Sequence, residues 1–132
     1  MQTFENLVKL RGFLAENAEA PSSDHIQNDS FAVLELVTVS GLWDLGANAW
    51  RPRTDVHRVI CAGPFFCGLV RGMRRGDYLE IEGELGDFLE KSALVENGNR
   101  HEFKRMRYAV HAIRISRLDR PDVLVDFGES DA

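Results

Sequence analysis

The sequence is poor in cysteine, and this scarcity excludes several kinds of small domain. Cys61 and Cys67 are too few for a disulfide framework or a cysteine-based zinc site. Both lie among apolar residues, which predicts two reduced thiols in the core. The four histidines show no metal-ligand spacing, and no glycine-rich phosphate loop with a lysine is present. We therefore expect no metal and no cofactor.

Long apolar runs are also missing. No segment approaches about 18 consecutive apolar residues, so no membrane span is expected. The first residues, MQTFENLVKLRG, lack the basic-then-apolar layout of a signal peptide, and we expect a cytoplasmic protein. The length of 132 residues fits one domain with a real core, and 44% apolar and 28% charged residues are typical of a globular chain.

Lysine is scarce as well: three of the sixteen basic residues are lysine and the others are arginine. Arginine binds phosphate in a planar fork and can stack on bases. The net charge of −5 by itself argues against nucleic acid. However, residues 119–132 hold five acids and one base, whereas residues 31–118 hold thirteen bases and eleven acids. We interpret residues 119–132 as a short, acidic, mobile tail that follows one domain, residues 1–118.

Alternation of apolar and polar residues predicts five strands. They cover residues 6–14, 31–40, 54–63, 77–85 with an extension to an Asn97–Gly98 turn, and 104–118. Residues 64–76, PFFCGLVRGMRRG, have the spacing of a short helix that begins at a proline and ends at a glycine. Residues 15–30 are interpreted as a loop, and residues 41–53 as a loop or the tip of a hairpin. Three strands, a helix and two strands are the order of the OB-fold, a mainly β Greek-key barrel that binds oligonucleotides or oligosaccharides.

Four stretches then resemble the bacterial single-stranded DNA-binding (SSB) family. NLVKLRGFL resembles the family's first strand, TDVHRVICAG its third, MRRGDYLEIEGEL its Arg–Gly turn and fourth strand, and YAVHAIRI its last strand. The resemblance spans residues 6–118. It implies an OB-fold without catalytic activity that stacks the bases of single-stranded DNA on aromatic side chains in a basic groove. It also implies a homo-oligomer, a tetramer or a dimer, that acts in DNA replication, recombination or repair.

The chain departs from the family where stacking residues are expected. Val56 stands where many members have an aromatic residue, and two further aromatic positions would fall near Ala62 and Glu90. The family's acidic tip ends in Pro-Phe, which recruits replication and repair proteins. This sequence ends in DFGESDA, which is acidic but lacks that dipeptide.

Two tryptophans lie in the segment 41–53. Trp43 and Trp50 are followed at once by RPR, which would put their rings beside the guanidinium groups of Arg51 and Arg53. We interpret the rings as base-stacking residues and Arg51 and Arg53 as DNA contacts, and the alternative is that the rings pack in the core or as a lid on one end of the barrel. Phe88 is a further candidate to replace a missing aromatic residue.

His57 and Arg58 are neighbours in a strand and therefore point to opposite faces. Arg58 shares its face with Val56, and we predict that it contacts phosphate or a base; the alternative is a solvated arginine. The resemblance places His57 near a subunit contact, together with Val8 and Leu10. Nothing near His57 supplies the nucleophile and orienting group of a catalytic site.

The densest basic stretch, RHEFKRMRY, follows the Asn–Gly turn. It interleaves Phe103 and Tyr108 with four bases that we predict to contact nucleic acid, namely Arg100, Lys104, Arg105 and Arg107. The alternative is a solvated hairpin. Glu80, Glu82 and Glu84 alternate on the outer face of the strand before it, and we expect DNA to avoid that face or another subunit to cover it.

Two functions from different classes fit these observations. The first is a single-stranded DNA-binding protein with little sequence preference. The second is an OB-fold adaptor or assembly protein of a replication-restart or mobile-element system, with weak or no DNA binding, because a fold does not fix a function. A small enzyme or sugar-binding protein on the same barrel is a third, weaker hypothesis.

Overall fold

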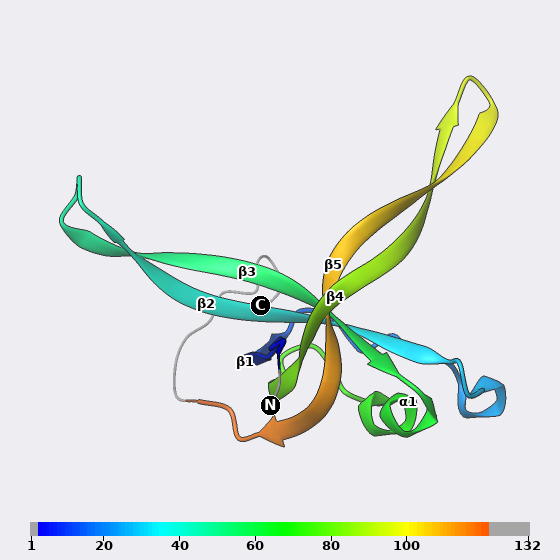
Figure 1. The fold of residues 1–132 in the computed structure, drawn as a ribbon, viewed down its shortest axis with the longest axis horizontal. Coiled ribbons are helices and arrows are strands. Elements are labelled where there is room, and N and C mark those ends of the chain that lie inside the picture. Colours follow the sequence, from blue (N-terminus) through cyan, green and yellow to red (C-terminus); the bar gives the residue numbers. More distant parts are fainter. Residues whose placement is uncertain (1–2, 122–132) are drawn as a thin grey trace.

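The computed structural model describes residues 3–121, which form a closed five-stranded barrel with one α-helix (Figure 1). The strand order around the barrel is β1-β2-β3-β5-β4, and β4 pairs back with β1. The helix α1 lies between β3 and β4, so the mainly β OB-fold order is confirmed. The elements are β1 (Val8–Leu14), a 3-10 helix (Ser23–His25), β2 (Phe31–Asp44), β3 (Ala49–Ala62), α1 (Pro64–Val70), β4 (Tyr78–Glu96) and β5 (Asn99–Leu118).

The core lies inside the barrel and is closed at one end by α1. Alternate residues of each strand point inward, so Leu34, Leu36, Val59 and Ile81 are almost completely buried. Cys67 and Val70 are the buried residues of α1, and their side chains join the same cluster.

Both cysteines are free and fully buried, as the sequence predicts. Burial raises the pKa of Cys61 to about 12, with a smaller contribution from Cys67. The Cys61 thiol is therefore protonated at neutral pH and is a packing group of the core.

The barrel closes through one parallel pairing, between β3 and β5. It consists of Val59 opposite Val110 and Ile60 opposite His111. All other strand pairs are antiparallel, and the longest of them are the hairpins β2–β3 and β4–β5.

Two glycines allow backbones to approach closely in this barrel. Gly83 sits at a β-bulge in β4, and a Cβ atom there would lie 2.3 Å from the carbonyl oxygen of His111. A Cβ atom at Gly12 would lie 2.1 Å from the carbonyl oxygen of Val37. The glycine of the Ile-Glu-Gly segment is thus needed for the close packing of β4 against β5 in the barrel.

Of the two interpretations of residues 41–53, the hairpin tip is confirmed and the loop is not. β2 and β3 stay paired to Trp43 opposite Trp50 and Asp44 opposite Ala49, and only residues 45–48 form the turn. The Asp44 carboxylate accepts hydrogen bonds from the backbone N–H groups of Gly46 and Ala47, at 2.9 and 3.2 Å. Only the turn-forming residues within 45–48 are used in this short turn, and Trp43 and Trp50 lie outside it, in the strands.

The predicted helix 64–76 is too long. Helix α1 ends at Val70, because Arg71 leaves the helical conformation and Gly72 has a φ of +87°. The following turn is held by a hydrogen bond from the Met73 N–H to the Val70 carbonyl, at 3.0 Å. The Met73 side chain still reaches the core, which explains the helical spacing in the sequence.

The predicted Asn97–Gly98 turn is confirmed. Asn97 and Gly98 have φ values of +52° and +80°, the left-handed conformation that a two-residue hairpin turn requires. β5 begins directly after the turn at Asn99, earlier than the predicted start at residue 104. Most of the acidic tail, residues 122–132, lies outside the described residues. Within residues 3–121, no helix is long and apolar enough to cross a membrane.

Candidate nucleic-acid interface

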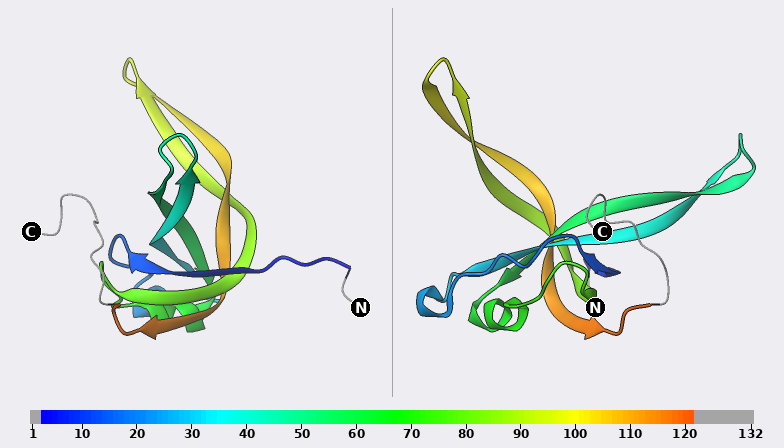
Figure 2. Two further views of the ribbon diagram at one scale, coloured as in Figure 1. Left: turned by 90° about the vertical axis from the view of Figure 1, so that its left-hand side faces the viewer. Right: turned by 180° about the vertical axis from the view of Figure 1, so that it is seen from behind.

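Two strand pairs continue beyond the barrel as twisted arms (Figure 2). The β2–β3 arm comprises residues 39–54 and the β4–β5 arm comprises residues 87–108. In both, each strand pairs only with its hairpin partner. The views of Figures 1 and 2 show that the arms leave the barrel in different directions, with an open angle between them. Arms of this kind expose side chains on both faces, because no other element covers them.

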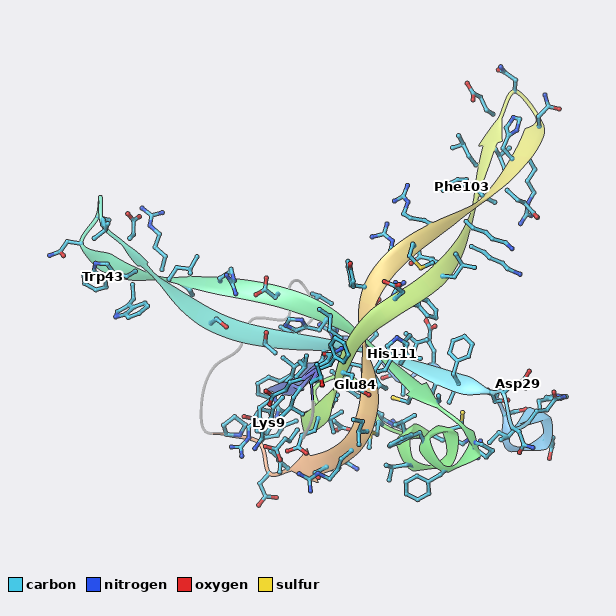
Figure 3. All side chains as sticks on the ribbon, viewed as in Figure 1. Lys9, Asp29, Trp43, Glu84, Phe103 and His111 are labelled. Carbon is cyan, nitrogen blue, oxygen red and sulfur yellow. The ribbon has the colours of Figure 1, made fainter. Side chains whose placement is uncertain are left out.

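Trp43 lies near the tip of the β2–β3 arm, away from the barrel (Figure 3), and Trp50 is directly opposite it in β3. Their rings meet edge to face, with centroids 5.5 Å apart and an interplanar angle of 77°. Trp43 is 46% and Trp50 67% exposed. A Cβ atom at Gly41 would lie 3.1 Å from the Trp50 ring. Because glycine has no side chain, the Trp50 ring can pack closely over the backbone of β2. The rings therefore do not form a lid on the barrel.

The strand register separates the tryptophans from Arg51 and Arg53. Directly opposite residues of an antiparallel pair share a face, and Trp43 is paired with Trp50. Arg51 is opposite Leu42 and Arg53 opposite Ser40, one residue out of step, so both arginines lie on the other face. The expected placement of the rings beside these guanidinium groups is wrong.

Both arginines of this second face also meet carboxylates. Arg51 forms an ion pair with Asp44, and Arg53 Nε donates to Asp55 Oδ2 at 2.9 Å. Since a carboxylate already neutralises each guanidinium group, we expect each to attract phosphate less strongly than an unpaired arginine would.

Arg58 lies on the same face of β3 as Trp50, where the arms leave the barrel. Its Nη1 donates to Glu90 Oε2, and its Nη2 lies 3.8 Å from Glu35 Oε1. Arg107 Nε approaches the same Glu90 oxygen at 3.4 Å. The hydrogen bond from Arg58, aided by the charges of Arg58, Arg107 and Arg105, holds the pKa of Glu90 below its usual range.

Two adjoining pockets share Arg58 and Glu35 in their walls. The larger has a volume of about 560 Å³, and its walls include Phe88 and Glu90. The Phe88 ring meets Phe31 edge to face, with centroids 5.9 Å apart. The smaller pocket, of about 440 Å³, is completed by Val56, Arg107 and Tyr108. The two pockets connect the base of the β2–β3 arm with the base of the β4–β5 arm.

The β4–β5 arm carries the remaining predicted bases. The Arg105 guanidinium lies over the Phe103 ring at 5.7 Å, a cation–π contact. Arg100 Nε lies 3.4 Å from Glu102 Oε1. Lys104 belongs to a third pocket of about 420 Å³ together with Phe103 and Lys91. The arm therefore combines exposed rings and positive charge, as single-stranded nucleic-acid surfaces do.

Tyr108 was not among the predicted contact residues, although it is the most exposed aromatic residue of the β4–β5 arm at 73%. It contributes to the smaller pocket beside Arg107 and Val56. The signal in the sequence was its position at the end of the basic stretch, where aromatic and basic residues alternate. Tyr108 thus provides a ring next to Val56, where the family resemblance leads one to expect an aromatic residue.

The residues predicted at a subunit contact lie on the barrel. Val8 and Leu10 are partly buried and pack against the core. His57 is half-buried, and its Nε2 is 2.8 Å from the Thr38 hydroxyl. Their part in an oligomer stays a prediction.

The acidic outer face of β4 is matched by bases. Glu80 lies 2.8 Å from Arg11 Nε and 3.3 Å from Lys9 Nζ, while Glu82 lies 2.5 Å from Arg114 Nη2. These ion pairs join β4 to its neighbours β1 and β5. The face therefore has little excess negative charge at these two positions. Among residues 3–121, no group of three or more His, Cys, Asp or Glu side chains could hold a metal ion.

Comparison with known proteins rests on structure, because no protein-family model and no curated protein matches the sequence. An SSB from Plasmodium falciparum, solved in complex with single-stranded DNA, matches with a TM-score of 0.65 at 17% identity, over 90% of this chain and 99% of that one. A small single-stranded DNA-binding protein from Streptomyces coelicolor matches with a TM-score of 0.54 at 17% identity, over 86% and 95%.

A deletion mutant of the single-stranded DNA-binding protein from Thermus aquaticus matches with a TM-score of 0.60 at 21% identity. That match covers 87% of this chain and 51% of the other. The three likenesses establish that this chain has the OB-fold seen in SSB structures, and they confirm the resemblance at the level of the fold.

Proposed function

We propose that this protein binds single-stranded DNA with little dependence on sequence and catalyses no reaction. The observation that carries the proposal is that both arms expose aromatic rings on a face that also holds arginine: Trp50 shares a face of β3 with Arg58, and the Arg105 guanidinium lies over the Phe103 ring. Stacking on rings and neutralisation of phosphates are the two interactions that non-specific single-strand binding needs. Three SSB structures with the same fold support the proposal.

The path we propose for the strand starts at Trp43 and Trp50 and passes Arg58. It continues through the pockets beside Phe88 and Tyr108, and it ends along the β4–β5 arm. Arg105 and Arg107 lie on the Phe88 face of that arm and would contact phosphates on this path, whereas Arg100 and Lys104 lie on its other face and would contribute from there. Arg51 and Arg53 would contribute only from the far face of their arm.

The first experiment is a titration with poly-dT followed by tryptophan fluorescence, at about 50 and 300 mM salt. We expect quenching, because stacked bases quench indole emission, and weaker binding at the higher salt, because phosphate contacts release counterions. Absence of binding at the lower salt would refute the proposal.

Trp43→Ala and Trp50→Ala then assign the rings, since each variant leaves one emitting indole. We expect each to weaken binding about tenfold, the effect of losing one stacked base. Phe65→Ala is the matched control, because Phe65 is an aromatic residue of α1 that is 75% exposed and belongs to neither arm. Equal losses of DNA affinity in all three variants would show that the tryptophans do not stack bases.

We further propose that the protein is a homo-oligomer, a dimer or a tetramer, that acts in DNA replication, recombination or repair. Val8, Leu10 and His57 are the residues proposed for the contact between subunits. Several subunits on one strand would offset a modest affinity of each. Light scattering measures the mass, and a monomer at micromolar concentration would contradict this proposal.

The alternative is an adaptor or assembly protein of a replication-restart or mobile-element system that binds DNA weakly or not at all. One observation favours it: Arg51, Arg53 and Arg58 each meet a carboxylate. A nucleic acid would have to compete with these acids. The poly-dT titration separates the two functions.

A further inference from the structure

The outer edge of β2 is open along the β2–β3 arm. β1 pairs with β2 only at Leu36 and Val37, so within residues 3–121 no strand lies beside this edge from Val39 to Trp43. Figures 1 and 2 show the arm free of other helices and strands. The side chains of Val39 and Trp43 are about half exposed. An open edge presents unpaired N–H and C=O groups, and these can pair with a further strand.

Three residues of this edge point their backbone groups away from β3. In an antiparallel ladder, residues bonded to the partner strand alternate with residues that face outward. The carbonyl of Glu35 accepts a hydrogen bond from the Ala15 N–H at 2.8 Å, on the side away from β3, and no bulge interrupts the β2–β3 register. Every second residue after Glu35 therefore faces outward, which includes Val39, Gly41 and Trp43. Their N–H and C=O groups have no hydrogen-bond partner in the described part of the chain.

The other edges of the two arms are protected against such pairing. β3 carries Pro52, which has no N–H to donate, between two arginines. The β4–β5 arm carries Lys91 in one strand and Lys104 in the other. Proline and charged side chains are common means by which proteins keep edge strands from associating. The segment VSGLW, residues 39–43, contains neither.

We propose that β2 of a second copy of this chain pairs antiparallel with this edge, with Gly41 opposite Gly41. In this register the open N–H and C=O groups of Val39, Gly41 and Trp43 in the two copies bond to one another. Val39 of each copy lies directly opposite Trp43 of the other, and a cross-strand pair of an aromatic and a β-branched residue stabilises a sheet. The contact needs no DNA, so the inference goes beyond the proposed function.

The edge is self-complementary, which favours a second copy over a different partner. The two-fold axis of the pair passes between the two Gly41 residues, where each copy meets its own equivalent. Glycine has no side chain that could collide there. The nearest charged residue, Asp44, falls opposite Thr38 of the second copy, so no like charges face each other across the pair.

The pairing joins two arms into one four-stranded sheet. Since directly opposite residues share a face, Trp43 and Trp50 of both copies lie on the same face of that sheet. Each copy thus contributes rings to one larger aromatic surface. This contact is distinct from the subunit contact at Val8, Leu10 and His57. Two different two-fold contacts are what a dihedral tetramer requires.

Amide hydrogen exchange, followed by NMR on the purified chain without DNA, tests the pairing directly. The residues of β2 that bond to β3 are protected in any case. We expect Val39, Gly41 and Trp43 to be protected as well, and to exchange more than about tenfold more slowly than Trp50 and Thr54, which face outward from β3. Alternating slow and fast exchange along residues 39–43 would overturn the pairing.

Val39→Pro removes an outward N–H and keeps every bond to β3, and its ring intrudes where the second copy would lie. We expect the mass measured by light scattering to fall by half. Thr54→Pro is the matched control, because Thr54 lies directly opposite Val39 and faces outward from the other edge of the arm. This variant should keep the mass of the unmodified chain. Circular dichroism checks that both variants fold, and if Val39→Pro does not, the exchange pattern decides.

The outcomes separate this contact from the proposed function. An unchanged mass in Val39→Pro would overturn the pairing and leave both DNA binding and an oligomer through Val8, Leu10 and His57 standing. A monomeric unmodified chain would overturn the pairing and the proposed oligomer, but not DNA binding. Slow exchange and a halved mass, together with no binding of poly-dT, would support the pairing and refute the proposed function.

Discussion

At the scale of single residues, absent side chains matter as much as those that are present. Gly83 lets β4 and β5 approach where a Cβ atom would collide with a backbone oxygen, and this residue was visible in the sequence as part of an Ile-Glu-Gly segment. The role of Glu90 could not be predicted. Its two arginine partners, Arg58 and Arg107, are distant in the sequence and meet it only in the folded barrel.

Gly83→Ala should lower the free energy of unfolding by about 2–4 kcal/mol, because the backbone of β5 must move to accept the new methyl group. Gly68→Ala is its control. Gly68 lies in α1 with no atom near the position of a new Cβ, so alanine should be neutral or stabilise the chain by up to about 1 kcal/mol. Urea unfolding measures both, and equal midpoints would contradict the close approach at Gly83.

At the scale of elements, the sequence predicts the number, order and type of the strands correctly, and errs where strands leave the barrel. Alternation indicates a strand because one face is buried, and the β2–β3 arm has no buried face. The turn-forming residues within 41–53 therefore leave a loop and a hairpin tip as alternatives, between which the weak strand signal does not decide. The faces of Trp50 and Arg51 also depend on register, which the sequence does not reveal, since a slip of one residue exchanges them.

Arginines of the two arms should contribute differently to the salt dependence of DNA binding. Arg105 makes no ion pair with a carboxylate in the described part of the chain, whereas Arg51 is paired with Asp44 and lies behind the tryptophans. Arg105→Ala should reduce the slope of log K against log salt by about 0.7, the value for one phosphate of single-stranded DNA. Arg51→Ala should change it less. Binding isotherms at four salt concentrations give the slopes, and a larger change for Arg51→Ala would reverse the proposed path.

At the scale of the whole molecule, acidic side chains on the outer surface of the barrel form ion pairs with basic side chains of neighbouring strands. Its outer sheet of β1, β4 and β5 carries acids and bases in pairs, while the arms carry most of the exposed aromatic rings. The strand order in the sequence correctly predicts the barrel. The acids of β4, considered without their partners, instead predict a face that repels DNA. Their partners Lys9, Arg11 and Arg114 come from two other strands, and only the register brings them together.

The ion pairs of Glu80 give the stability of the barrel a definite dependence on pH. The hydrogen bond from Arg11, aided by Lys9, lowers the pKa of Glu80 in the folded chain. Its stabilising effect is therefore complete above the unfolded pKa of about 4.3 and is lost as the pH falls through the lower, folded value. The difference in melting temperature between the unmodified chain and Glu80→Gln should be largest at neutral pH and shrink toward zero in acid.

Thermal melts monitored by circular dichroism at a series of pH values measure this difference. Glu84→Gln is the control, because Glu84 is exposed on the same strand and makes no ion pair within residues 3–121. A difference for Glu80→Gln that stays constant down to about pH 3 would show that its ion pairs do not stabilise the fold.

The parallel seam between β3 and β5 has a consequence for how the chain reaches this structure. Two residue pairs, Val59 with Val110 and Ile60 with His111, join segments about fifty positions apart, while each hairpin brings near neighbours together through a tight turn. Closing a long loop costs more chain entropy than closing a short one. We therefore expect both hairpins to form early and the seam to close last, so that a newly made chain displays its tryptophans and its basic hairpin before it has a finished barrel.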